Sequence, residues 1–290
     1  MSESLNKSFS GKECGLFSNL HAENLPFENF EDKVLRLRKK LLSLKKVMVA
    51  FSGGIDSQFL VKTAADILGE NCIAVTVSSC FVPKKEIESA VSFCLSQKIP
   101  HIILKAEPLL VEGIAENPKN RCYRCKKSIF QMILEEAEKN GIEYVLEGTN
   151  VSDTGDFRPG LKALGELGIL SPFLECGFTK DEIRSASKNS GLASWNKPST
   201  ACLASRFVYG ENLTKEKLER VEAAEDFLHG LGFGQLRVRV HKNLARIEVT
   251  EGEMENLFST RSKVLQKLKS LGFDYVTFDL GGFKSGSMNV

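Results

Sequence analysis

The chain has 290 residues, of which 42% are apolar and 26% charged, the composition of a globular protein with one large domain or two ordinary ones. A net charge of +2 excludes the strong basic field of a typical nucleic-acid-binding protein, and no apolar run reaches the roughly 18–20 residues of a membrane span. Eight cysteines occur without a recognisable secretion signal. We therefore expect a cytoplasmic protein in which metal or sulfur chemistry outranks structural disulfides.

Residues 1–30 show neither the helical nor the strand period, and we expect a poorly ordered N-terminal extension. A regular alternation follows. Helices are predicted at 34–44, 57–68, 84–97 and 126–139, and strands at 47–51, 73–78, 101–105 and 143–147, with a further strand at 168–171 and a helix at 180–190. Strands that alternate with helices predict an α/β domain, a doubly wound parallel sheet, over residues 31–207.

The composition changes after Gly191, where a loop carries the chain's one Trp. The pattern then predicts a helix at 214–231, strands at 235–240 and 244–249, a helix at 255–271 and a strand at 274–280. We interpret residues 208–290 as a smaller C-terminal α+β domain that serves substrate binding or oligomerisation.

The first predicted strand runs into the sequence SGGIDS at residues 52–57, directly before an apolar helix pattern. A strand, a glycine turn and a helix aim backbone N–H groups and a helix N-terminus at an anion. Gly53 and Gly54 let the backbone approach a phosphate closely, and Ser52 and Ser57 add hydroxyl donors. The pattern predicts nucleotide binding, although a tight turn between strand and helix is the simpler alternative.

Asp56 has no purpose in a loop that only holds anions, but it suits a Mg²⁺ ligand, directly or through water. The Lys of the ordinary nucleoside-triphosphate loop is missing. The pattern SGGxDS resembles instead the PP-loop of the ATP pyrophosphatases. That resemblance implies that ATP is cut between its α- and β-phosphates and that a substrate oxygen becomes adenylated.

Cys122 and Cys125 lie three residues apart in the basic stretch RCYRCKK. Two thiolates at this spacing can hold one metal ion or two corners of an iron–sulfur cluster, and neighbouring cations favour the thiolate form. The one good distant partner is Cys202, in the turn ACLASR at residues 201–206. Three cysteines leave one iron of a 4Fe-4S cluster without a protein ligand, so that iron could bind an exogenous sulfide.

A thioredoxin-like redox pair is the alternative for this CxxC, but that motif opens a helix straight after a strand, and residues 117–120 read as a loop. A structural zinc site would require four protein ligands. A third reading is two coincidental thiols, although both lie among charges rather than in an apolar run. Four other cysteines lie in or beside apolar segments, and most of them are expected in the core: Cys72, Cys80, Cys94 and Cys176.

Together, these motifs resemble one PP-loop family closely, the LarE family of sulfur-inserting enzymes. The resemblance spans roughly residues 31–290 and rests on five segments. They are SGGIDS at 52–57, EGTNVSDTGDFRPGLKAL at 147–164, SWNKPSTACLASRFVYG at 194–210, RVRVHKNLARIEV at 237–249 and DLGGFKSGSMN at 279–289.

The resemblance implies an ATP-dependent, AMP- and pyrophosphate-forming sulfurtransferase of nickel-pincer nucleotide cofactor biosynthesis. Its substrate would be pyridinium-3,5-biscarboxylic acid mononucleotide, of which each carboxylate is adenylated and then converted to a thiocarboxylate. Some family members sacrifice the sulfur of one cysteine, whose position matches Cys202. Others carry two more cysteines and pass on a sulfide bound to a 4Fe-4S cluster, and the pair at Cys122 and Cys125 favours this second kind.

Further site residues follow from the residue chemistry and the resemblance. Arg158 and Arg206 are cations for ATP and the anionic substrate, while Asp153 and Asp156 follow a strand end and suit Mg²⁺ or the ribose. A solvated turn is the alternative for this acidic pair.

A mixed-charge group is expected in the C-terminal domain. Arg237 and Arg239 share one strand face with His241, because they are spaced by two. We expect this face to bind substrate phosphate, with Glu225 and Glu248 near a metal ion or the Arg side chains. An exposed, salt-bridged sheet face is the alternative. The resemblance implies matching positions by a subunit interface and a trimer-based homo-oligomer.

Two other classes compete with this prediction. A cluster-dependent tRNA thiolase also combines SGGxDS with three cysteines, but it needs a basic RNA-binding surface, which a net charge of +2 disfavours. A non-catalytic iron–sulfur or nucleotide sensor predicts ATP binding without pyrophosphate release, and Asp56 in the loop argues against it. The sequence does not identify the sulfide donor.

Overall fold

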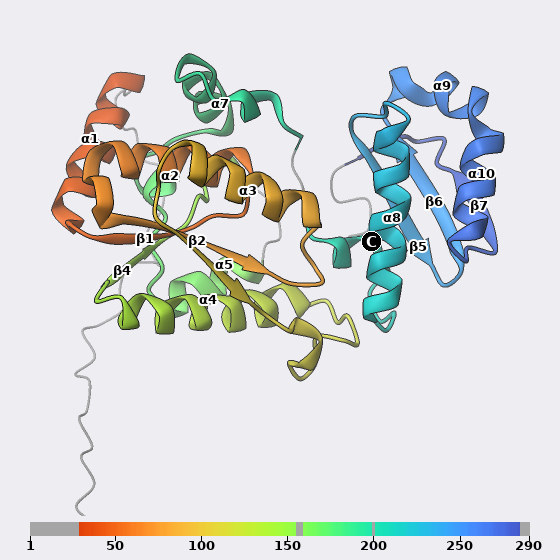
Figure 1. Cartoon of the computed structure of the whole chain (residues 1–290), viewed down its shortest axis with the longest axis horizontal. Helices are drawn as coiled ribbons and strands as arrows, with labels where there is room; N and C mark the ends of the chain where they lie inside the picture. The colour runs from red at the N-terminus through yellow and green to blue at the C-terminus, as the bar shows by residue number, and fades with distance from the viewer. Residues whose placement is uncertain (1–28, 155–158, 199–200, 285–290) are drawn as a thin grey trace, which may run out of the picture.

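A computed structural model describes residues 29–154, 159–198 and 201–284. A parallel sheet lies between layers of helices, and a smaller sheet with its own helices lies beside it (Figure 1). The predicted N-terminal extension falls, up to residue 28, outside the described residues, as do Asp156 and Arg158. Among the described residues, no helix has the length and apolar character needed to cross a membrane.

The larger sheet has four strands, all paired in parallel, in the order β3-β2-β1-β4. They are β1 (Val47–Ala50), β2 (Cys72–Ser78), β3 (His101–Lys105) and β4 (Tyr144–Leu146). The predicted doubly wound α/β fold is confirmed. The strand order reverses between β1 and β4, and a ligand of such a sheet binds at the carboxyl ends of the strands at this point. The strand expected at 168–171 is reduced to one parallel bridge between Leu146 and Leu170.

Helices cover both faces of this sheet, because its strands are apolar on both sides (Figure 1). Val47 and Val49 of β1 point into one core layer, and Met48 points into the other. The first layer contains α1 (Phe30–Leu44), α2 (Ile55–Leu68), α3 (Lys84–Ser96) and α7 (Lys180–Asn189). The second contains α4 (Arg121–Lys139) and α5 (Pro159–Glu166), and the one-turn α6 (Pro172–Glu175) lies in the first.

The smaller sheet has the order β5-β6-β7. Its strands are β5 (Leu236–His241), β6 (Leu244–Val249) and β7 (Tyr275–Phe278), and its helices are α8 (Lys215–Gly230), α9 (Met254–Ser259) and α10 (Arg261–Ser270). Their apolar core also takes in Phe81, Ile114 and Phe207, which precede the predicted boundary between residues 207 and 208. Apolar side chains from the part of the chain that forms the larger sheet therefore pack into the core of the smaller sheet.

Two helices differ from the prediction in ways that have physical causes. The expected helix at 255–271 is interrupted at Thr260, whose hydroxyl donates to the Asn256 carbonyl at 2.8 Å, a local bond that bends helices. The helix expected at 126–139 begins five residues earlier, at Arg121. Its first turn has no apolar period but is held by a buried arginine, so Cys122 and Cys125 lie on a helix rather than before one.

Candidate active site

The predicted phosphate loop lies between β1 and α2. Gly53 has φ +78°, and a Cβ at this position would lie 3.0 Å from the Glu86 carbonyl oxygen, so only glycine fits without strain. Gly54 occupies the N-cap position of α2 and makes no side-chain cap. The first N–H groups of this 14-residue helix therefore face the carboxyl edge of the sheet and suit an anion.

The two loop serines hold the shape of the loop. The hydroxyl of Ser57 donates to the Gly54 carbonyl at 3.0 Å and accepts from the Ser52 amide at 3.2 Å, and the two hydroxyls lie 3.0 Å apart. Lys197 reaches the same loop from a distant segment and donates to the Gly53 carbonyl at 3.2 Å. The loop is thus organised before any ligand arrives.

The loop after β4 packs directly against the start of α2. A Cβ at Gly148 would lie only 2.9 Å from the Ser57 amide nitrogen, so the close approach requires a glycine. This contact brings Asp56 beside Asn150, whose side-chain Nδ2 donates to the Asp56 carboxylate at 3.5 Å. The two loops therefore meet at the point where the strand order reverses.

Asp56 is the acid of this meeting point. Burial and the nearby Asp153 carboxylate raise its pKa, while an ion pair with Lys180 of α7 opposes the rise. The Asp153 carboxylate itself accepts a hydrogen bond from the backbone N–H of Asn150 at 3.1 Å. Two carboxylates that repel each other in a partly buried place suit a cation, and their oxygens are the ligands that Mg²⁺ prefers.

The structure also brings the three predicted cysteines together. Cys122 and Cys125 lie one turn apart at the start of α4, and Cys202 directly precedes a short 3-10 turn, Leu203–Arg206. Arg121 links the two segments, because its Nη1 donates to the Cys202 sulfur at 3.4 Å. No three His, Cys, Asp or Glu side chains within the described ranges meet closely enough to hold a metal ion, so the thiols are neighbours rather than a preformed ligand set.

The three thiols differ in their acidity. Burial raises the pKa of Cys125 to about 12, with Cys202 as the next cause, and burial also raises the pKa of Cys122 against the opposing charge of Arg121. Burial would raise the pKa of Cys202 too, but the charge and hydrogen bond of Arg121, with the charge of Arg206, hold it below its ordinary value. Cys202 is therefore the thiol that is most readily a thiolate.

Arg206 positions the Cys202 segment. Its guanidinium is 1% exposed and forms a two-pronged ion pair with Glu225 at 3.0 and 2.9 Å. The same group donates to the carbonyls of Ala201 and Cys202 at 2.8 and 3.2 Å. Glu225 also accepts the Val238 amide at 2.9 Å. Arg206 therefore holds the backbone of the turn that carries Cys202, and Glu225 links Arg206 to β5.

The strand face of Arg237 and Arg239 is covered rather than open, since these side chains are 8% and 5% exposed. Arg239 pairs with the fully buried Glu248 at 2.9 Å, and Arg246 pairs with the other oxygen of that carboxylate at 3.1 Å. Burial lowers the pKa of Arg237 to about 10, and the nearby Arg206 adds to the effect. The carboxylates expected near a metal ion or arginines are thus engaged by arginines.

Comparison with known proteins identifies the family of the chain. No protein-family model matches the chain. It is 40% identical, over 86% of its length and 91% of the relative's, to the pyridinium-3,5-bisthiocarboxylic acid mononucleotide synthase of Lactiplantibacillus plantarum. The chain belongs to the LarE family. An uncharacterised protein of Synechocystis is 39% identical over 89% of the chain and 97% of its own length.

A more distant relative supports the class of the LarE fold. One subunit of the glutamine-hydrolysing GMP synthase of Thermoplasma volcanium is 27% identical over 69% of each chain. It belongs with the PP-loop ATP pyrophosphatases. The family resemblance and the PP-loop class predicted from the motifs are therefore confirmed, and the protein belongs to a family of enzymes.

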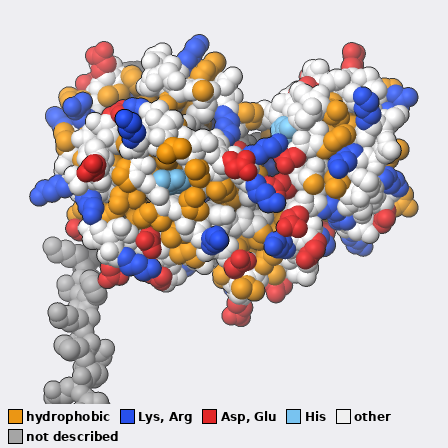
Figure 2. All heavy atoms as spheres, in the orientation of Figure 1, with side chains coloured by type: hydrophobic (Ala, Val, Ile, Leu, Met, Phe, Trp, Pro, Cys, Tyr) orange, Lys and Arg blue, Asp and Glu red, His pale blue; other side chains and the backbone are white. Residues whose placement is uncertain are grey.

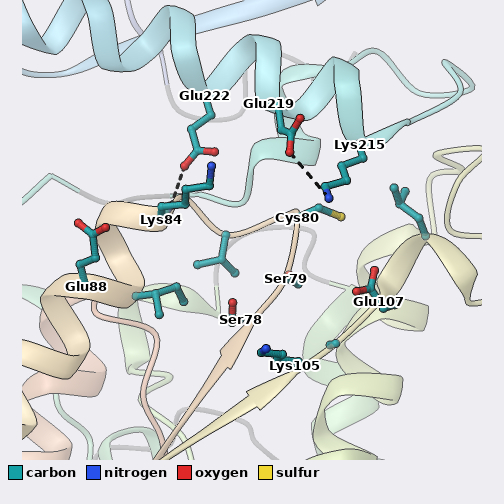
Figure 3. A pocket seen from close by; sticks show the side chains of 14 residues that line it. Ser78, Ser79, Cys80, Lys84, Glu88, Lys105, Glu107, Lys215, Glu219 and Glu222 are labelled. Carbon is teal, nitrogen blue, oxygen red and sulfur yellow. Dashed lines mark hydrogen bonds and ion pairs between the residues drawn. The ribbon is translucent and has the colours of Figure 1, made fainter.

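A cavity of about 550 Å³ lies between the ends of β2 and β3 and helix α8, and none of the site residues described above lines it (Figure 3). Its lining mixes lysines such as Lys84 and Lys215 with glutamates such as Glu219 and Glu222 (Figure 3). Charged side chains of both signs gather along the junction of the two halves in Figure 2. Cys80 lines this cavity and is partly exposed, unlike the buried Cys72, Cys94 and Cys176, for which the expected core position is confirmed.

Several site residues escaped the sequence analysis. Asn150 and Lys197 lie in segments that carry the family resemblance, and Lys180 lies outside them, but no sequence pattern predicted the contacts of these three residues with the phosphate loop. Arg121 adjoins Cys122 but reads as one more cation of a basic stretch. The pattern predicted the start of this helix five residues later, so no signal in the sequence set Arg121 apart.

Proposed function

We propose that the protein inserts sulfur into pyridinium-3,5-biscarboxylic acid mononucleotide at the expense of ATP. The observation that carries the proposal is the convergence of Cys122, Cys125 and Cys202 around Arg121, in a chain that also holds an acid-bearing Gly-Gly loop. The name of the Lactiplantibacillus relative supplies the product class, a bisthiocarboxylic acid mononucleotide.

Adenylation is assigned to the loop after β1. The α2 N-terminus and the loop amides bind the phosphates, and Asp56 with Asp153 would hold Mg²⁺, which neutralises the pyrophosphate leaving group. A substrate carboxylate oxygen attacks the α-phosphorus, the bond to the β-phosphate oxygen breaks and pyrophosphate leaves. Lys180 then has to release Asp56 when the cation binds. Arg158 and Asp156 belong to the same proposal but lie outside the described residues.

Sulfur transfer is assigned to the three thiols. Their number, their origin in two segments and the cation between them fit a 4Fe-4S cluster, which would supply a sulfide on the iron that the protein leaves unligated. Sulfide attack on the acyl carbon expels AMP and leaves a thiocarboxylate. Cys122, Cys125 and Cys202 would hold the cluster, and Arg206 keeps the backbone of Cys202 in place.

Sacrifice of Cys202 is the second candidate, favoured by the lowered pKa of this thiol. Its thiolate would attack the acyl-adenylate and expel AMP. Loss of the Cα proton to a base would then break the Cβ–Sγ bond, which leaves dehydroalanine and the thiocarboxylate. A tRNA thiolase and a non-catalytic sensor remain competing classes, and a gel shift with bulk tRNA separates the first of them.

Anaerobic purification, iron and sulfide analysis and mass spectrometry after turnover test the proposal. We expect pyrophosphate release that depends on the substrate, iron bound at about four per chain, and an unchanged mass at Cys202. Asp56→Asn should lose pyrophosphate release. Formation of ADP and phosphate would contradict the PP-loop assignment, and a loss of hydrogen sulfide mass at Cys202 would establish the sacrificial route. The predicted trimer-based oligomer and cytoplasmic location stay predictions.

A further inference from the structure

Arg121 is a buried cation whose surroundings contain sulfur instead of carboxylate. Its side chain is 3% exposed, and its guanidinium lies 5.8 Å from the ring centre of the buried Phe81. Nη1 donates to the Cys202 sulfur at 3.4 Å. Among the described residues it forms no ion pair with Asp or Glu, and its Nε is buried without a hydrogen-bond partner.

This arrangement is costly unless an anion completes it. A buried charge without an anionic partner and a buried donor without an acceptor both destabilise a fold. The chain meets this cost elsewhere, since Arg206 pairs with Glu225 and Arg239 with Glu248. Beside Arg121 the groups within electrostatic reach are the thiols of Cys202, Cys122 and Cys125.

We propose that Arg121 binds the transferable sulfur as a hydrosulfide anion through its Nε–H, the buried donor that no group among the described residues accepts, near the Cys202 sulfur. The inference rests on the proposed function, because it names the residue that holds the sulfur substrate at the same three-thiol site. Arg121 makes no covalent bond and stays protonated; it supplies charge and the hydrogen bond of Nε.

The walls of the site favour a small anion. Phe81 closes one side of the guanidinium and is tied to the sulfur-bearing turn, because its carbonyl accepts the Leu203 amide at 2.8 Å. On the other side lies the Cys202 sulfur. Hydrosulfide carries the negative charge that would balance the Arg121 cation, and it is about the size of the neighbouring thiol groups.

Sulfide binding to the anaerobically reconstituted protein, without ATP or nucleotide substrate, tests this directly. Radiolabelled sulfide is dialysed to equilibrium against wild type, Arg121→Gln, Arg121→Lys and Arg124→Gln, with iron measured in each sample. Arg124 is the matched control, because it lies on the same helical turn but is exposed and donates to the Glu112 carbonyl at 3.2 Å.

At equal iron content, Arg121→Gln should bind sulfide at least about ten-fold more weakly, the equivalent of 1.4 kcal/mol. Arg121→Lys should restore part of the affinity, since it keeps the charge and loses the Nε donor. Arg124→Gln should match wild type. In turnover, Arg121→Gln should need more sulfide for half-maximal thiocarboxylate formation while it releases pyrophosphate normally.

Unchanged sulfide affinity in Arg121→Gln overturns the inference. So does a loss of sulfide that only follows a loss of iron, because Arg121 would then support the metal site and not the anion. The proposed function fails in a different way. Wild type would then form no thiocarboxylate, whatever the sulfide affinity of the variants.

Discussion

Three of the four buried arginines among the described residues, Arg206, Arg239 and Arg121, lie in two contrasting environments. Arg206 and Arg239 lie in the C-terminal half, and each meets a buried carboxylate at 2.9 Å. Arg121 lies at the start of α4, is similarly buried, and meets thiols instead. The first group is paired with carboxylates of the chain, whereas Arg121 meets only thiols and leaves its Nε without an acceptor among the described residues.

The difference separates support from chemistry. A closed ion pair fixes the backbone of the sulfur-bearing turn, because Arg206 also donates to the Ala201 and Cys202 carbonyls. Arg121, beside Cys202, keeps an unused Nε donor and a charge that no carboxylate among the described residues balances. Strain or imbalance of this kind persists in a fold when function retains it.

The largest effect is expected from breaking the buried ion pair between Arg206 and Glu225. Arg206→Met leaves Glu225 buried without its cation and removes the donors to two carbonyls. The free energy of unfolding should fall by about 3–5 kcal/mol. Urea denaturation under reducing conditions measures the change. A loss below about 0.5 kcal/mol, the range of ordinary surface substitutions, would show that the pair contributes little.

A second test compares the thiols on either side of Arg121 in the metal-free protein. Cys125 has a pKa of about 12, whereas Arg121 lowers that of Cys202. At neutral pH, Cys125 should therefore carry roughly a thousand-fold less thiolate than an ordinary thiol. Cys202 should carry more thiolate than an ordinary thiol does. Iodoacetamide should alkylate Cys202 first as the pH rises, as peptide mass spectrometry would show. Equal rates at both residues contradict the assigned acidities.

The same contrast shows what the sequence could and could not predict. The Gly-Gly loop was predictable because its strand, turn, acid and helix are contiguous. Its partners were not, since Asn150 and Lys180 lie 94 and 124 positions from Asp56. The fold class followed from alternating apolar periods, and these periods also placed the strands of both sheets.

Burial was the part that the sequence left open. Alternation placed Arg237 and Arg239 on one strand face, but it does not say that this face is covered. Arg121 lies among other cations and therefore reads as solvated, until the fold brings Phe81 and Cys202 around it. Contacts between segments distant in the chain decide both cases.

A smaller effect is expected when a charge is removed but the shape is kept. Glu248→Gln leaves Arg239 and Arg246 beside a neutral amide. The free energy of unfolding should fall by about 1.5–3 kcal/mol, the value of hydrogen bonds to charged groups. Glu251→Gln is the matched control, because Glu251 is exposed and should change stability by less than about 0.5 kcal/mol. Equal stability of the two variants would refute the assignment of Glu248 to a closed pair.

The smallest effect should come from Arg121→Met, and it sharpens the comparison most. In the metal-free protein Arg121 has no carboxylate among the described residues, so its removal strands no buried anion of that kind. A methionine of similar length keeps the packing against Phe81 and relieves the desolvation of the guanidinium. The free energy of unfolding should stay within about 1 kcal/mol of wild type or rise by up to about 2 kcal/mol. Urea denaturation beside Arg206→Met provides the measurement. A loss as large as that of Arg206→Met would mean that Arg121 is a structural cation like the other two, and that the thiols alone already complete it.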